Sequence, residues 1–406
     1  MLNRRSQRLA VTIPPMIRPV PLIVLAQLFG TSLWFSANGV GDALMRDWGL
    51  TPHDIGTLTA SVQLGFILGT LLFAISGLAD RFAASRVFLF SAITGATANL
   101  ALAWLAQDLA TATAYRFLTG FALAGIYPVG MKLIVSWAPE RRGEALAWLV
   151  GMLTLGTATP HLLQGLSLAP GWPWVVTFAS GLALLGGTLI AWLGDGPHLN
   201  RSPRLQWGGV FHSFRQPGFR AAALGYFGHM WELYAFWVLV PLFIAGLYPL
   251  ASTTTLSLLA FVVIGVGAIG CVWAGRLSRR LGSARVAVGA LAISGSLCLL
   301  YPWLVELSAE LALIALLIWG VTVIADSAQF SALASRHTPA DGVASALAIM
   351  NSIGFGLSAL AIPITTSLWQ DLGAQVSWLL LPGAVLGVVA MYPLLRARSP
   401  VTIESS

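Results

Sequence analysis

Long apolar segments recur along the whole chain and constrain its fold more than any other feature of the sequence. A stretch of about 20 apolar residues crosses the hydrocarbon core of a bilayer as one helix. The 406 residues are 57% hydrophobic and only 9% charged, whereas a soluble domain is about 25% charged. The sequence therefore predicts an all-α integral membrane protein with twelve transmembrane helices, at about residues 21–46, 53–79, 84–106, 110–137, 143–166, 172–194, 218–246, 254–275, 282–303, 309–335, 342–368 and 375–396.

The basic residues lie mainly in alternate connections between these segments. The formal net charge of +7 would by itself be compatible with a nucleic-acid partner. If the N-terminus is cytoplasmic, however, nearly all of the 22 Lys and Arg residues fall on the cytoplasmic side, where membrane proteins concentrate positive charge. We therefore expect a lipid bilayer and no nucleic acid as partner. Both termini are placed in the cytoplasm, and the protein in the plasma membrane (the inner membrane in a Gram-negative bacterium).

The chain before the first apolar segment carries four arginines, at positions 4, 5, 8 and 18. No short apolar core with a small-residue cleavage site follows, so we interpret the first apolar segment as a transmembrane helix and not as a removed signal peptide. Cys271 and Cys298 both fall in apolar segments. We expect them to be small core residues and not a disulfide or a metal pair.

One connection, residues 194–217, is longer and more polar than the others. It divides the chain into 1–194, 195–217 and 218–406, with six apolar segments on either side. The two halves resemble each other, because the loops after the second and eighth segments match, as do those after the fourth and tenth. Two six-helix halves related by a repeat are typical of secondary transporters, with the substrate site near the midplane. We therefore predict two pseudo-symmetric six-helix bundles joined by a cytoplasmic loop.

The loop after the second segment resembles the G-x-L-a-D-R-x-G-R-[RK] signature of the major facilitator superfamily, since it keeps Leu78, Asp80, Arg81 and Arg86. The second copy keeps Arg280 but has an arginine at the acidic position. The run RFLTGFALAGIYP, which starts at Arg116, resembles the fourth helix of the organic-anion branches, although Leu123 stands where a glutamate is common. The fifth-helix signature of drug–proton antiporters is absent.

This resemblance implies alternating access, with helices one, four, seven and ten lining a central cavity. It also implies a cytoplasmic latch, in which charges of the repeated loops bind the end of the eleventh helix: Asp80, Arg81, Arg86 and Arg280. An anion at a helix N-terminus is stabilised by the helix dipole. The alternative is that these charges only set the topology.

Four fixed charges lie well inside the predicted cavity helices: Arg116 and Lys132 on the fourth, Glu232 on the seventh and Asp326 on the tenth. Burying a cation in lipid costs at least about 2.5–3.5 kcal/mol, so such residues usually face a bundle interior or an aqueous cavity. We expect Glu232 and Asp326 to take up and release the coupling proton, with His229 between them in depth. A permanent ion pair with one of the cations is the alternative.

Helical geometry limits which cation reaches a common site. At about 100° per residue, Arg116 and Tyr127 share a face, whereas Lys132 lies about 160° from Arg116 on a straight helix. A bend at Pro128 would change that angle. Without the bend, one of the two cations points to a neighbouring helix, or Lys132 extends towards the cytoplasmic interface.

Polar and aromatic residues on the predicted cavity helices complete the expected substrate site. Hydrogen bonding between helices is the alternative role for the polar ones, and the more favoured one for Ser and Thr. The residues that we expect to contact the substrate are Trp34, Asn38, Arg116, Tyr127, Lys132, Trp231 and Gln329.

We therefore predict a monomeric, proton-coupled secondary transporter of a small organic solute, with an anion favoured by the buried cations. A proton-coupled drug or metabolite exporter of the same fold is the alternative, and it would favour an aromatic, weakly charged pocket. A membrane sensor is disfavoured because no long soluble segment follows Arg398. An enzyme is disfavoured because no metal-spaced cluster or nucleophile–base pair is visible. No cofactor is expected.

Overall fold

The computed structural model describes residues 18–77, 81–166, 171–199, 212–339 and 342–396. Asp80 lies outside these ranges. The N-terminal half contains α1 (Pro19–Thr31), η1 (Asn38–Val40), α2 (Gly41–Trp48), α3 (Pro52–Ser76), α5 (Ala84–Trp104), α6 (Leu109–Leu123), α7 (Tyr127–Trp137), α8 (Arg142–Gly165) and α9 (Trp172–Leu193). The C-terminal half contains α11 (Pro217–Leu247), α12 (Thr253–Gly265), α13 (Gly267–Leu281), α14 (Ser283–Leu307), α15 (Ala309–Thr322), α16 (Ser327–Arg336), α17 (Val343–Ser367), α18 (Trp369–Leu372), η2 (Gly373–Leu379) and α19 (Leu381–Arg396).

These elements make twelve crossings of a helical bundle. In the described part of the chain, 11 helical segments are long and apolar enough to span a membrane, and the shorter apolar helix α1 adds the first crossing together with α2. Their bounds agree with the predicted segments to within a few residues at most ends, as α9 and the predicted 172–194 illustrate. The twelve-helix prediction is therefore confirmed.

Several helices begin where the sequence supplies a cap for their first backbone N–H groups. Thr51 and Asp54 form a reciprocal capping box at the start of α3. Asp108 does the same with Thr111 at the start of α6. The first N–H groups of a helix have no partner inside it, so such side chains fix where the helix starts.

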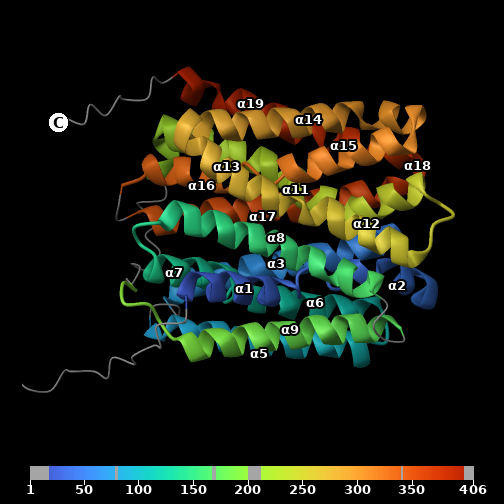
Figure 1. The fold of residues 1–406 in the computed structure, drawn as a ribbon, viewed down its shortest axis with the longest axis horizontal. Coiled ribbons are helices and arrows are strands. Elements are labelled where there is room, and N and C mark those ends of the chain that lie inside the picture. The colour runs from blue at the N-terminus through green and yellow to red at the C-terminus, as the bar shows by residue number, and fades with distance from the viewer. Residues whose placement is uncertain (1–17, 78–80, 167–170, 200–211, 340–341, 397–406) are drawn as a thin grey trace, which may run out of the picture.

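Helices of the two halves form separate groups that meet along a seam. In Figure 1 the blue-to-green helices lie together on one side and the yellow-to-red helices on the other. α5 packs on α6 and α9 within the first group, and α14 packs on α15 and α19 within the second. The most extensive contacts that join the groups are those of α3 with α17 and of α8 with α12 and α13. Any site between the halves is therefore flanked on its two sides by these contacting helices.

Four of the twelve crossings are interrupted near their middle. The first breaks between Thr31 and Asn38, where the chain forms turns. The fourth breaks at residues 124–126, the eighth at Val266 and the tenth at residues 323–326. The break in the fourth crossing comes just before Pro128, the place at which the sequence allows a bend. Non-helical backbone at membrane depth is tolerated only where protein or a water-lined cavity satisfies it.

The interrupted fourth and tenth crossings are related by the internal repeat. The second part of each begins at Tyr127 or Ser327, which are 200 positions apart. A glycine before each break lies against a carbonyl of a neighbouring helix, Gly120 against Val62 O and Gly320 against Val263 O, so that a Cβ at either position would clash with backbone. The repeat therefore extends beyond the loops to the close helix crossings and the breaks.

Candidate functional site

Aromatic rings from both halves meet at the seam. Trp34, in the break of the first crossing, lies 5.0 Å from Phe66 of α3, 5.7 Å from Tyr234 of α11 and 5.8 Å from Phe355 of α17, measured between ring centroids. Tyr127, the first residue of α7, lies 6.4 Å from Trp34. We call these five residues the aromatic cluster. Because Trp34 stacks on two rings of the opposite half, the cluster couples the two groups of helices at their centre.

Arg116 holds the broken backbone that carries Trp34. Its guanidinium, which is fully buried, donates to Leu33 O at 3.0 Å and to Trp34 O. It also donates to Ser36 Oγ at 3.0 Å and to Asn99 Oδ1 at 3.1 Å. The planar fork of an arginine suits several acceptors at once, and Leu33 O also accepts a hydrogen bond from Ser36 N at 3.5 Å within the break. Arg116 is therefore engaged by protein on several sides, and we revise the expectation that it binds an anionic substrate.

Further hydrogen bonds extend this network through the N-terminal half. Asn99 of α5 donates to Val176 O at 3.2 Å and to Ser180 Oγ at 3.0 Å, both on α9. Ser32, also in the break, donates to Ala179 O at 3.0 Å. The break in the first crossing is thus tied to α5, α6 and α9, which fixes the position of the Trp34 ring.

In the C-terminal half, a buried histidine and a buried aspartate lie in contact at the break of the tenth crossing. His229 Nδ1 of α11 is 2.8 Å from Asp326 Oδ1, and each side chain is only 1% exposed. Asp326 is the last residue before α16. The His229 ring is flanked by Tyr226 and Phe330, at 5.9 and 5.8 Å. Apart from this contact, none of the side-chain N and O atoms of His229 and Asp326 has a hydrogen-bond partner among the described residues. His229 thus contacts Asp326 directly.

Glu232, one turn further along α11, points into the C-terminal bundle. It is fully buried and accepts hydrogen bonds from Trp319 Nε1 at 2.6 Å and Ser294 Oγ at 3.0 Å. The thiol of Cys298 lies 3.6 Å from its Oε1. No arginine or lysine pairs with Glu232 in the described part of the chain. The carboxylate thus joins α11 to α14 and α15, and neither expected cation is its partner.

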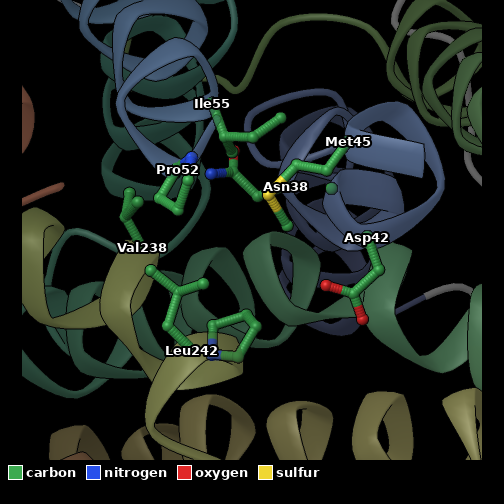
Figure 2. A pocket seen from close by; sticks show the side chains of 9 residues that line it. Asn38, Asp42, Met45, Pro52, Ile55, Val238 and Leu242 are labelled. Carbon is green, nitrogen blue, oxygen red and sulfur yellow. The ribbon is translucent and has the colours of Figure 1, made fainter. Parts of the chain in front are cut away.

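The other predicted site residues fall in several places. Trp231 lies away from the aromatic cluster, where its Nε1 donates to Leu379 O at 2.8 Å. Asn38 donates to Thr59 Oγ1 at 2.8 Å and lines a small pocket of about 20 Å³ shown in Figure 2, between α2, α3 and α11. Gln329 is buried on α16, and Lys132 is half-buried on α7. Of the loop residues, Arg81, Arg86 and Arg280 are exposed.

Further residues complete the centre. Tyr234 belongs to the same polar and aromatic run as His229 and Glu232, whereas Phe66 and Phe355 cannot be told by sequence from other aromatics on apolar helices. Trp34 Nε1 donates to Gln63 Oε1 at 3.1 Å. In the described part of the chain, Gln63 Nε2 and both amide atoms of Gln27 are buried without a hydrogen-bond partner. Buried polar atoms are nearly always paired in proteins, so these amides are candidates to bind a ligand or water.

A profile of the Major Facilitator Superfamily matches residues 23–363. Among solved structures, the partially occluded inward-open form of the xylose transporter XylE from Escherichia coli superposes with a TM-score of 0.73. The alignment covers 93% of this chain and 97% of XylE at 16% identity. At that identity the likeness shows the fold.

Curated relatives match over shorter stretches. The niacin transporter NiaP of Acinetobacter baylyi is 33% identical over 29% of this chain and 28% of its own length. The quinolone resistance transporter of Acinetobacter baumannii is 32% identical over 35% of this chain and 36% of its own. The 4-hydroxybenzoate transporter PcaK of Pseudomonas aeruginosa is 28% identical over 37% of this chain and 32% of its own. The matches span about a third of each relative.

Proposed function

The chain belongs to the major facilitator superfamily, whose members transport solutes and are not enzymes, and from this premise we propose that it takes up a small aromatic carboxylate together with protons. The observation that carries the proposal is the aromatic cluster, which lies between the two halves. The buried His229–Asp326 pair supports the proton coupling. A site between two repeat-related bundles is open to either side in turn as the bundles rock.

The substrate class follows from the chemistry of the cluster and its surroundings. Niacin and 4-hydroxybenzoate, named for two of the relatives, each combine one aromatic ring with a carboxylate. The rings of Trp34, Tyr234 and Phe355 pack on one another here, and they would offer stacking surfaces for such a ring when the two halves separate. The amide groups of Gln27 and Gln63 offer hydrogen-bond donors that are unpaired in the described part of the chain. Lys132, on the same helix as Tyr127, stays a candidate to attract the anion, and Gln329 a candidate contact.

Asp326 is the proposed proton carrier, and His229 positions it. A carboxylate in an apolar interior is costly when charged and unpaired. When Asp326 is ionised, His229 within 2.8 Å stabilises it. When Asp326 is protonated, that attraction is lost, and His229 no longer holds the break before α16 against α11. Glu232 is assigned a positioning role because its hydrogen bonds all run within the C-terminal half.

The remaining sequence-based expectations are retained as parts of the proposal. The protein acts as a monomer in the plasma membrane with both termini in the cytoplasm. The exposed Arg81 and Arg280, with Asp80, form the latch that holds one end of the seam closed. The concentration of arginines at that end supports this orientation.

Uptake into proteoliposomes tests the proposal. The purified protein is offered nicotinate, 4-hydroxybenzoate, cyclohexanecarboxylate and xylose, with and without an inside-alkaline pH gradient. We expect the gradient to drive accumulation of the two aromatic acids at least tenfold above that of the non-aromatic acid. Equal uptake of the cyclohexane acid would argue against recognition by the cluster. Uptake indifferent to the gradient would argue against proton coupling.

Export is the second candidate, and the quinolone resistance transporter of Acinetobacter baumannii favours it. The same aromatic cluster would accept a weakly charged drug. Expression in a host that lacks its major drug exporters distinguishes the two. Uptake predicts no gain in quinolone tolerance, whereas export predicts a gain that the Trp34→Ala variant loses.

A further inference from the structure

A hollow on the bundle's outer surface, distinct from the central cluster, lies between α3, α5 and α6. Its volume is about 500 Å³, and its wall is formed by Phe73, Phe82, Arg86, Val87, Phe90, Ser91, Thr94, Phe121 and Ala122. From Arg86 to Thr94 it extends for about 12 Å along α5. Phe82 and Phe90 are 60% and 65% exposed. The hollow is therefore an apolar groove on a surface that faces the surroundings of the bundle.

One end of the groove carries a positive charge. Arg86 is exposed on the first turn of α5. Among the described residues, no hydrogen bond or ion pair engages its guanidinium. The first two N–H groups of α5 are already capped by Asp195, at 3.2 Å from Ala84 N and 2.7 Å from Ser85 N. The cation at the mouth of the groove is thus available to a ligand, whereas the helix N-terminus is not.

We propose that this groove binds one anionic phospholipid, with the phosphate on Arg86 and an acyl chain along Phe90 and Phe121. A membrane-spanning protein surrounds itself with lipid, so a groove open to the bilayer is filled by an acyl chain. The charge selects the headgroup, because an arginine near the membrane surface favours an anionic lipid about fivefold over a neutral one. A zwitterionic lipid would fill the apolar part without this preference.

The groove also borders the break in the fourth crossing. Phe121 and Ala122 precede the end of α6, and Gly125, within the break, lies so close to α5 that a Cβ there would clash with the Ser91 side chain and lie 3.3 Å from the Phe73 ring. A lipid in the groove therefore packs against the wall that supports the break, and so stabilises the folded bundle.

Lipid binding to the purified full chain in detergent tests this inference without requiring transport. Native mass spectrometry compares dioctanoyl phosphatidylglycerol with dioctanoyl phosphatidylcholine, and the thermal midpoint is recorded with each lipid. We expect about fivefold tighter binding of the glycerol lipid and a higher midpoint with it. Arg86→Gln should remove the preference, because it weakens binding of the glycerol lipid more than binding of the choline lipid. Equal binding of both lipids by the unmodified chain would overturn the proposal.

Two matched controls separate the groove from general effects. Arg285 is also the third residue of its helix and is exposed, so Arg285→Gln should keep the preference. Thr94→Trp fills the groove and should weaken the binding of both lipids. Thr188→Trp is its control, because Thr188 is also an exposed threonine that bonds the carbonyl four residues before it. This variant should not weaken the binding of either lipid. A preference that survives Arg86→Gln, or binding that survives Thr94→Trp, would refute the assignment.

Discussion

His229 Nδ1 lies 2.8 Å from Asp326 Oδ1, and this pair joins the middle of α11 to the break that precedes α16. Both side chains are almost completely buried. A buried ion pair is weak evidence for stability, because desolvation offsets most of its attraction. Its position at a helix break, with Asp326 Oδ2 unpaired in the described part of the chain, is better explained by a functional role. This position supports the proposal that the pair takes part in proton coupling.

The aromatic cluster, and not every aromatic of α11, should determine substrate affinity. Trp34→Ala removes a ring that stacks on two rings of the opposite half, and we expect KM for the aromatic acid to rise about tenfold, equivalent to about 1.4 kcal/mol. Trp231→Ala is the matched control, because its indole bonds Leu379 O away from the cluster. Uptake kinetics in proteoliposomes measure both. Equal effects of the two variants would contradict the assignment.

Arg116 should act on stability more than on substrate binding. Arg116→Lys keeps the charge but loses the fork that reaches Leu33, Ser36 and Asn99. Each buried acceptor left unpaired costs about 1–3 kcal/mol, so we expect a clearly lower thermal midpoint. In the folded fraction, substrate affinity should change less than threefold. An intact midpoint with lost affinity would restore Arg116 to the substrate site.

Glu232 should act on stability more than on proton coupling. Glu232→Gln keeps the shape but replaces a carboxylate acceptor of Trp319 and Ser294. Hydrogen bonds to a charged group contribute about 1.5–3 kcal/mol, so the thermal midpoint should fall. Uptake by the folded variant should still respond to the pH gradient. Loss of that response at an unchanged midpoint would make Glu232 the proton carrier, as the sequence alone had suggested.

Pro128 should be dispensable for the break in the fourth crossing. The tenth crossing breaks at the equivalent place although Ala328 stands at the position of Pro128. Pro128 also occupies the first turn of α7, where its missing N–H costs little. We expect Pro128→Ala to keep transport within about threefold, since close packing at Gly120 persists. Transport assays alongside Gly120→Val, which should fail to fold stably, measure the difference.

Much of the fold could be predicted because hydropathy and charge report directly on bilayer crossings. The repeat and the interruption before Pro128 were also visible in the sequence. The break in the first crossing was not, because residues 32–37 contain neither proline nor glycine. Its backbone carbonyls are partners of Arg116, so the role of that arginine could not be inferred without the break.

The site was only partly predictable for a related reason. Trp34, Tyr127, His229 and Asp326 stood out because bulky aromatics and charges are informative on apolar helices. Phe355 did not, since a phenylalanine on a membrane helix contacts lipid as readily as a ligand. Trp231 was misplaced because the sequence does not determine the rotation of α11 against its neighbours. Asp195, which caps α5, lies in a connection whose path only the fold defines.

The most direct measurement of the central claim is pH-gradient-driven uptake by Asp326→Asn in proteoliposomes, with Asp371→Asn, at an exposed acidic residue, as the matched control. The account predicts that the Asp326 variant loses accumulation of the aromatic acid against its gradient while it still exchanges internal for external substrate within about threefold of the unmodified rate. The control should accumulate normally. Gradient-driven accumulation by Asp326→Asn equal to that of the unmodified protein would contradict the account.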